Sequence, residues 1–430
     1  MELAMLAEKI KNGGCNEKFK KLYGDGKTDF IKERYLKAVW NFESLYGNRD
    51  IEIISIPGRS EILGIHTDHN HGRVLAAAIN LDIIAVVSKS LVPGGRKSHI
   101  RIKSEGFEPD DVDIENLAPE DSEKFTSKAI IRGVCARFAE LGYEIGGFDA
   151  YTVSDVLKGS GLSSSAAFEI FVGFTLNHLF NGDKIPPVDI AKIGQCAENN
   201  YFGKPCGLMD QTACSVGGFV AIDFKNPSDP IVEKVDFDLT KSGYSLCIVS
   251  PGGSHDGLND EYAAITKEMK QVASYFGKEV LRDVDKAEFN ANIKQLRELY
   301  GDRAILRAMH YFAENTRVRA GAECLRDGNF EGFLQFVTAS GNSSYKYLQN
   351  IYVPKDPRNQ EISLALAISE EILANKQAAV RVHGGGFAGT IQAFIPKKSV
   401  SEYFEKIKSV FGENSCIELS VRNDGAVVVT

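Results

Sequence analysis

The distribution of apolar and polar positions predicts a chain in which strands and helices are mixed. Short runs rich in Val and Ile predict strands, whereas longer runs with apolar residues three or four positions apart predict helices. The predicted strands are residues 51–56, 74–79, 83–88, 99–103, 148–156, 244–249, 378–383 and 390–395, with 426–430 as a candidate edge strand. The predicted helices are residues 8–19, 31–45, 125–141, 168–180, 188–201, 361–373 and 400–411, with further helices between 261 and 348. Because the elements follow no strict strand–helix–strand alternation, the pattern indicates an α+β fold.

Three breaks in the pattern predict irregular structure. Pro57 is expected to end the first strand, because proline cannot donate to a β-ladder. A hairpin turn is expected at residues 93–95, which read Pro-Gly-Gly, and the acidic residues 110–123 are expected to form a loop.

The longest apolar helix begins directly after a glycine- and serine-rich segment, residues 158–167. The first N–H groups of a helix lack partners and carry a partial positive charge, and glycines allow a ligand to approach the backbone. These features favour a site for a polyanion such as a nucleoside triphosphate. The segment lacks the Gly-Lys-Ser/Thr ending of the common P-loop. The alternative is a small-residue turn that a serine caps at the start of a core helix.

A second polar segment, residues 58–72, contains an arginine, a glutamate, three histidines and an aspartate within a short stretch. The three histidines could bind a metal, but their spacing fits no zinc pattern and no second ligand cluster is visible. The favoured interpretation makes Arg59 a partner for an anion, and His66 and Asp68 hydrogen-bonding groups for a polyhydroxy ligand.

Three weaker signals occur later in the chain. Asp210 follows Gly207 in a small-residue loop, where a carboxylate ordinarily caps the next helix. Glu198 lies on a predicted helix and could simply face solvent, and the glycine loop at 384–389 could be an ordinary hairpin. Their occurrence together with the first loop and with Arg59 nevertheless favours phosphoryl transfer.

Bulk properties restrict the class of protein. A chain of 430 residues predicts two domains plus additions, with a boundary near residues 217–229. The composition, 43% hydrophobic and 25% charged, is typical of a soluble globular protein, and the net charge of -8 favours neither nucleic acid nor an anionic membrane. The eight cysteines form no Cys-x-x-Cys pair, and no signal peptide or membrane-spanning segment is visible. We therefore expect reduced thiols and a cytoplasmic location.

The motifs together resemble the GHMP small-molecule kinases and, within them, the galactokinases. Three family motifs occur in order, at residues 58–70, 159–167 and 384–389, although the proline usual near the start of the second motif is absent. Residues 205–211 resemble the galactokinase catalytic loop, and residues 255–262 resemble the segment that supplies a sugar-binding tyrosine. The resemblance extends from about residue 42 to the end of the chain.

This resemblance implies a two-domain fold with the site between the domains. It implies a domain like ribosomal protein S5 domain 2 over residues 42–220 and a ferredoxin-like domain over residues 221–430, after a helical extension at 1–41. It also implies ATP and Mg²⁺ as cofactors and a small-molecule sugar as substrate. A monomer is expected.

The resemblance also implies roles for individual residues. Asp210 would lie near the anomeric hydroxyl of the sugar, and Arg59 beside it would keep that carboxylate ionised so that it can accept the hydroxyl proton. The expected sugar contacts are His66, Asp68, Gly207 and Tyr262. The expected ATP-binding residues are Gly159, Ser160, Gly161, Leu162, Ser163, Ser164 and Ser165. The expected Mg²⁺ ligands are Ser165 and Glu198.

One departure from the family pattern concerns the sugar. Ile65 occupies the position at which galactokinases carry a glutamate that is expected to hold the sugar 6-hydroxyl, and Glu61 is a candidate substitute. Besides a galactokinase, the sequence therefore leaves open a 1-kinase for a sugar altered at C6, such as galacturonate or an arabinose. A non-catalytic, galactokinase-like sugar sensor is the third alternative. The intact Ser165, Ala166 and Ala167 favour an enzyme over the sensor.

Overall fold

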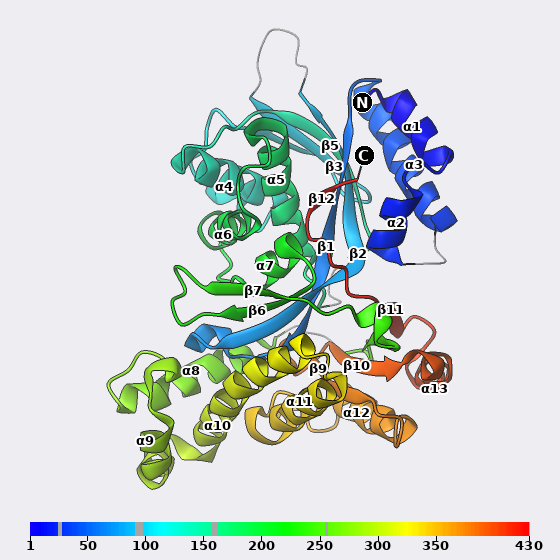
Figure 1. Cartoon of the computed structure of the whole chain (residues 1–430). Helices are drawn as coiled ribbons and strands as arrows, with labels where there is room; N and C mark the ends of the chain where they lie inside the picture. Colours follow the sequence, from blue (N-terminus) through cyan, green and yellow to red (C-terminus); the bar gives the residue numbers. More distant parts are fainter. Residues whose placement is uncertain (25–27, 91–97, 157–160, 254–256, 430) are drawn as a thin grey trace.

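A twisted eight-stranded sheet forms the first half of the molecule in the computed structural model (Figure 1). The structure describes residues 1–24, 28–90, 98–156, 161–253 and 257–429. The strand order is β12-β1-β2-β5-β3-β4, with β6 paired to β2 and β7 paired to β6. These strands are β1 (Glu52–Leu63), β2 (Arg73–Lys89), β3 (His99–Ser104), β4 (Asp110–Asp113), β5 (Phe148–Ser154), β6 (Phe219–Asp223), β7 (Ile231–Val235) and β12 (Val427–Val428).

Helices cover both faces of this sheet (Figure 1). On one face lie α4 (Ser127–Glu140), α5 (Ser164–Asn181), α6 (Pro187–Ala197) and α7 (Met209–Val216). On the other lie the helices of the N-terminal extension, α1 (Leu3–Lys11), α2 (Asn16–Tyr23) and α3 (Thr28–Tyr46). The central strands β1 and β2 are buried along almost their whole length, because each face supports its own hydrophobic core.

The second half of the chain forms a smaller four-stranded sheet packed against helices. Its strand order is β11-β8-β10-β9, built from β8 (Tyr244–Val249), β9 (Ala379–His383), β10 (Thr390–Pro396) and β11 (Cys416–Leu419). Its helices are α8 (Asn259–Tyr275), α9 (Lys286–Ala291), α10 (Ile293–Arg326, interrupted at Gly301), α11 (Phe330–Ser343), α12 (Glu361–Ile372) and α13 (Val400–Phe411). The end of the chain then returns to the first sheet, where β12 pairs with β1.

Most predicted elements are confirmed, and four predictions were wrong. The single helix expected over residues 8–19 is two helices, since α1 ends at Lys11, α2 begins at Asn16, and Gly13 between them is left-handed (φ 82°). The first strand does not end at Pro57 but continues to Leu63, because a shift of register between Pro57 and Arg59 accommodates the proline. The predicted strands at 74–79 and 83–88 are one long strand, β2. Part of the acidic segment is strand rather than loop, since β4 pairs with β3. The turn expected at residues 93–95 lies outside the described residues.

The domain boundary expected at residue 220 remains a prediction, and the pairing of the strands near it can be compared with it. Strand β7 lies beyond that boundary in sequence but pairs with β6 of the first sheet. The candidate edge strand at the end of the chain is confirmed as β12, although it is shorter than expected.

Candidate functional site

An arginine–aspartate pair connects the end of β1 to the start of α7. Arg59 donates from Nε to Oδ1 of Asp210 and from Nη2 to Oδ2, and both distances are 2.7 Å. Such a two-point contact fixes both the position and the plane of the carboxylate. Burial alone would raise the pKa of Asp210, but the charge and hydrogen bonds of Arg59 outweigh that effect and hold the pKa below its ordinary value. Asp210 is therefore an ionised carboxylate with a fixed orientation.

The start of α5 reaches the same aspartate. Ser163 adopts a left-handed conformation (φ 62°) immediately before α5, and its hydroxyl donates to Oδ2 of Asp210 at 2.7 Å. Arg59 also donates from Nη1 to the carbonyl oxygen of Gly161, and its backbone N–H donates to the carbonyl oxygen of Leu162 at 3.0 Å. The predicted nucleotide loop, from Gly161 onward, is thus attached to the Arg59–Asp210 pair. The predicted ATP contacts at Gly159 and Ser160 lie outside the described residues.

Two buried carboxylates lie on the helices behind this loop. Glu198 is 3% exposed at the end of α6, where the chain makes a wide helical turn, and Glu169 on α5 is fully buried. The Gln211 amide joins them, since its Nε2 donates to Glu169 at 2.8 Å and to Glu198 at 3.1 Å. Burial, and then the negative charge of Glu198, raise the pKa of Glu169 well above its ordinary value.

These residues suit an Mg²⁺ ion that is shared with a nucleotide. Ser165 is exposed in the first turn of α5, and Glu169 lies four residues later on the same side of that helix. Mg²⁺ in phosphoryl-transfer sites is commonly held by one or two protein oxygens, with phosphates and waters completing the shell. Ser165 and Glu198 could supply such oxygens. Within the described residues, no group of three or more His, Cys, Asp or Glu residues is arranged to hold a metal ion on its own.

The third glycine motif closes the other side of the site. His66 bonds through Nε2 to the carbonyl oxygen of Gly385 at 2.9 Å, and the hydroxyl of Tyr262 on α8 donates to the carbonyl oxygen of Gly386 at 2.8 Å. The rings of His66 and Tyr262 are stacked, with 6.4 Å between their centroids. Because burial lowers the pKa of His66, the ring is neutral, and its contact with a carbonyl places the hydrogen on Nε2. Nδ1 of His66 is then an acceptor.

Asp68 and Gly207 lie against each other although they are far apart in sequence. A Cβ atom at Gly207 would approach Oδ2 of Asp68 to 2.6 Å, so a larger residue would displace the carboxylate. The structure therefore brings Asp68 next to Gly207 and His66 next to Tyr262, all four of them predicted sugar contacts, and Asp210 follows Gly207 by three residues.

The side chain of Ile65 is buried in the protein core. It is 1% exposed and belongs to the hydrophobic cluster that also contains Met269 of α8 and Tyr311 of α10. Glu61 is also buried, and burial raises its pKa to about 7, although Arg381 and Arg59 act in the opposite direction. Its Oε1 lies 3.9 Å from Nη2 of Arg381, which is too long for a hydrogen bond, and it has no hydrogen-bond partner among the described residues.

Glu169 and Gln211 were missed as site residues from the sequence alone. A signal for Glu169 was present, because it is the one charged side chain within the apolar helix of residues 168–180, and it follows Ser165 by one helical turn. A charged group inside a buried helix needs a partner. No comparable signal is present for Gln211, because its contacts are with two residues from other helices.

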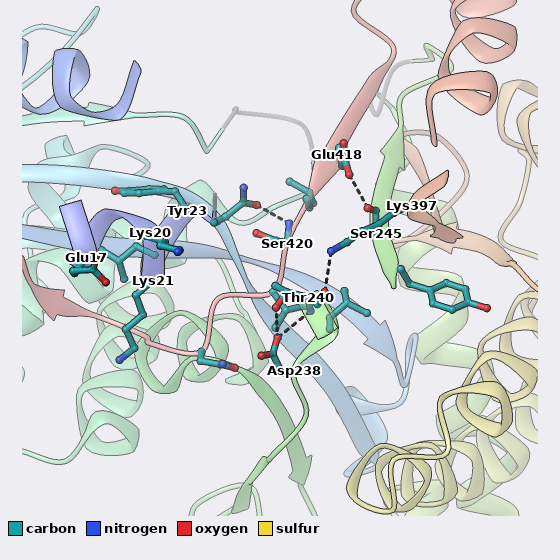
Figure 2. A pocket seen from close by; sticks show the side chains of 18 residues that line it. Glu17, Lys20, Lys21, Tyr23, Asp238, Thr240, Ser245, Lys397, Glu418 and Ser420 are labelled. Atoms are coloured by element: carbon teal, nitrogen blue, oxygen red, sulfur yellow. Dashed lines mark hydrogen bonds between the residues drawn. The ribbon is translucent and has the colours of Figure 1, made fainter. Parts of the chain in front are cut away.

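A cavity of about 980 Å³ lies elsewhere, between α2 of the extension and the second sheet (Figure 2). Its lining includes no residue of the three motifs or of the catalytic loop. Several of its polar groups bind one another: Lys397 donates to the carbonyl oxygen of Thr240 at 2.8 Å, and Ser245 donates to Glu418 at 2.6 Å (Figure 2). We assign the functional site to the motif residues for this reason.

Comparisons with known proteins agree with this arrangement. Residues 129–218 match the family model for the GHMP kinases N terminal domain, and residues 41–89 match the galactokinase galactose-binding signature. Among solved structures, a Lactococcus lactis galactokinase complexed with galactose superposes with a TM-score of 0.74 at 23% identity, covering 90% of this chain and 98% of that one. A mevalonate kinase superposes with a TM-score of 0.59 at 15% identity, covering 86% of this chain and 99% of that one. The chain therefore has the two-domain α+β fold of the GHMP kinases, as expected from its sequence.

The curated relatives narrow the family further. A galactokinase from Glaesserella parasuis serovar 5 (strain SH0165) is 32% identical over 382 residues, covering 87% of this chain and 91% of the relative. A galactokinase from Streptomyces coelicolor is 29% identical over 375 residues, covering 86% of this chain and 91% of the relative. This chain belongs to the galactokinase family. It is thus an ATP-using phosphotransferase with an alcohol group as acceptor. Separately, no helix in the described part of the chain is long and apolar enough to cross a membrane.

Proposed function

We propose that this protein transfers the γ-phosphoryl group of ATP to the 1-hydroxyl of galactose, which yields galactose 1-phosphate and ADP. The observation that carries this proposal is the two-point contact of Arg59 with Asp210, to which Ser163 of the nucleotide loop also donates. This contact supports the proposal, because it holds an ionised carboxylate between the segments that we expect to bind the sugar and the nucleotide.

In this reaction Asp210 would accept a hydrogen bond from the 1-hydroxyl and take its proton as the oxygen attacks the γ-phosphorus. Arg59 supports that role, because it keeps the carboxylate ionised and turned in one direction. Phosphoryl transfer depends mainly on positioning and on neutralising charge, so the orientation of Asp210 matters as much as its basicity.

The nucleotide would lie against the start of α5. The N–H groups and hydroxyls of residues 159–165 would bind the phosphates, aided by the partial positive charge of the helix start. Ser165 and Glu198 would hold Mg²⁺, and that ion would neutralise charge on the phosphates when bound.

The sugar would lie between Asp210 and the third glycine motif. Nδ1 of His66 is an acceptor and Asp68 is a carboxylate, so both suit the hydroxyls of a sugar. Gly207 would leave room for the substrate beside Asp68, and Tyr262 would contact the sugar from α8.

The second candidate is a 1-kinase for a sugar altered at C6, and the observation that favours it is Ile65. An aliphatic side chain cannot bond a 6-hydroxyl, but Ile65 packs in a hydrophobic cluster, and Glu61 has an acceptor oxygen without a partner among the described residues. These facts favour galactose. We further propose that the protein is a cytoplasmic monomer.

A panel of sugars tests the proposal. ADP release with ATP and Mg²⁺ would be measured for galactose, 6-deoxygalactose, galacturonate and arabinose, on the natural protein and on Ile65→Glu. We expect galactose to give the highest kcat/KM. A higher value for galacturonate or arabinose would establish the second candidate instead. Binding of galactose without ADP release from any sugar would identify a sensor.

A further inference from the structure

The N-terminal extension reaches the strand that leads into the nucleotide loop. Arg34 of α3 is almost fully buried and bonds through Nη1 to Oδ1 of Asp82 at 2.6 Å. Its Nη2 donates to the backbone carbonyl oxygens of Asp82 at 2.9 Å and of Val153 at 3.4 Å. Asp82 lies on β2 and Val153 near the end of β5, so one arginine connects the extension with two strands of the central sheet.

The same guanidinium holds a residue beyond the end of β5. Nη1 of Arg34 lies 3.1 Å from Oδ2 of Asp155, and the N–H of Asp155 donates to the carbonyl oxygen of Asp82 at 3.0 Å. Burial would lower the pKa of Arg34, but the charges of Asp82 and Asp155 outweigh burial, so the pKa is raised and the arginine stays charged. The guanidinium of Arg34 is therefore a charged partner for both aspartates.

Residues beside Asp155 connect this contact to the site. Val156 is 4% exposed and shares a hydrophobic cluster with Leu162 of the nucleotide loop. A Cβ atom at Gly58 would lie 2.8 Å from the carbonyl oxygen of Leu162 and 3.0 Å from Cγ1 of Val156, so the backbone of Gly58 packs closely against the backbone of Leu162 and the side chain of Val156. Arg59, the next residue, bonds to both Leu162 and Asp210. A continuous set of contacts thus leads from Arg34 to the catalytic carboxylate.

We propose that Arg34 is a positioning residue for the nucleotide site, through which the N-terminal extension holds the ATP-binding loop from Gly161 onward in its binding geometry. This inference rests on the proposed function, because it assumes that Leu162 to Ser165 bind ATP. The contacts from which we argue it involve only Asp155, Val156 and the loop from Gly161 onward. Residues 1–40, which include Arg34, lie outside both matched family models.

A second arginine, which lies shortly after α3, provides a matched control. Arg49 donates from Nη1 to Oδ2 of Asp149 at 2.7 Å, and Asp149 is fully buried. Both arginines bind acidic residues on or next to β5, but Asp149 lies at the start of that strand, away from the nucleotide loop. Arg49→Met therefore removes a similar ion pair with the sheet without touching Asp155.

The test compares Arg34→Met, Arg34→Lys and Arg49→Met. KM for ATP, KM for galactose, kcat and the melting temperature would be measured, together with the dissociation constant of ATP by calorimetry. If the loop adopts its binding geometry only a tenth of the time without Arg34, the apparent affinity for ATP falls about tenfold. We expect this change in Arg34→Met, with KM for galactose within about twofold of the natural protein, and a smaller change in Arg34→Lys. Arg49→Met should lower the melting temperature and leave both KM values within about twofold.

Asp155→Asn tests the same contact from the other side. Arg34 keeps an ionic partner in this variant, because Asp82 still binds it. The side chain of Asp155 is 37% exposed, so the variant should fold, and we expect its ATP affinity to fall in the same direction as that of Arg34→Met. Equal effects of Arg34→Met and Arg49→Met, or a parallel rise of both KM values, would overturn the inference. A natural protein that binds ATP but phosphorylates no sugar would refute the proposed function alone. Absence of ATP binding would refute both.

Discussion

Two arginine–aspartate pairs in this molecule have similar distances but different surroundings. In the site, Arg59 contacts both oxygens of Asp210 at 2.7 Å, and 29% of the Asp210 side chain remains exposed. Under the extension, Arg34 contacts Asp82 at 2.6 Å, and the side chain of Asp82 is fully buried. Geometry alone would not tell which pair has a chemical role.

The remaining contacts of each aspartate distinguish the two pairs. Asp82 also accepts hydrogen bonds from Tyr23 at 2.6 Å and from Ser55, and Arg422 lies 3.4 Å away. Its oxygens are used by protein groups, so the pair can only hold the extension, the sheet and the C-terminal segment together. Asp210 receives Arg59 and Ser163 and keeps an exposed side. A carboxylate that is both ionised and partly exposed can bind a substrate hydroxyl, whereas a fully enclosed one stabilises the fold.

Asp210→Asn should have the largest effect on turnover. The amide keeps the shape of the side chain but cannot accept a proton, and loss of a general base typically lowers kcat by about 10² to 10⁴. We expect a melting temperature close to that of the natural protein, because the side chain is partly exposed. Steady-state kinetics and thermal unfolding measure the two effects, and a kcat near the natural value would remove Asp210 from the mechanism.

Asp82→Asn should show the reverse pattern. It leaves the buried guanidinium of Arg422 without its anion and that of Arg34 with Asp155 alone, and breaking a buried ion pair in this way costs about 3–5 kcal/mol of stability. Urea unfolding should reveal this loss, while kcat at saturating ATP and sugar should stay within about tenfold of the natural value. If Asp82→Asn lowered kcat as strongly as Asp210→Asn without a loss of stability, the distinction between the two pairs would fail.

Glu61→Gln tests a third buried carboxylate, one without a short contact to an arginine. The pKa of Glu61 is raised from 4.5 to about 7, so its folded form prefers the proton. The natural protein therefore has its full stability at this position below pH 4.5 and loses it as the pH rises through 7. The shift corresponds to about 3 kcal/mol at pH 8. We expect the Glu61→Gln variant to be more stable by up to that amount at pH 8 and equal to the natural protein near pH 4.5.

The control for Glu61→Gln is Glu43→Gln on the exposed face of α3. Melting temperatures from pH 4.5 to 8 would be compared for the three proteins. A constant difference between Glu61→Gln and the natural protein across this range would show that Glu61 does not titrate within it.

Glu198→Gln should have the smallest effect of the four. A neutral amide is a weaker Mg²⁺ ligand than a carboxylate, so half-maximal activity should require about tenfold more Mg²⁺. Glu140→Gln, at the exposed end of α4, is the control. An unchanged Mg²⁺ titration in Glu198→Gln would mean that this carboxylate only bonds to Gln211.

The local features of this chain could be predicted from its sequence. The helix of residues 168–180, the glycine-rich turn before it and most strands follow from periodicity and turn residues, which act within a few positions of one another. The order of the three motifs sufficed to indicate the GHMP kinases, and the expected pairing of Arg59 with Asp210 is present. Local rules failed where a neighbouring strand intervened, as at Pro57, where pairing with β2 through a change of register extends β1 by several residues.

Only the tertiary structure decided which distant residues meet. Arg59 and Asp210 are 151 positions apart, and Glu169 and Gln211 are 42 positions apart, so no local pattern can specify either contact. The burial of Ile65 among residues of α8 and α10, and the contact of Arg34 with Asp155, likewise depend on how the sheets and helices pack. The sequence by itself determined the elements, the glycine loops and the family, because these depend on the chemistry of neighbouring residues. The state of each carboxylate, enclosed as at Asp82 or exposed as at Asp210, was set by long-range packing, which controls solvent access and the number of available partners.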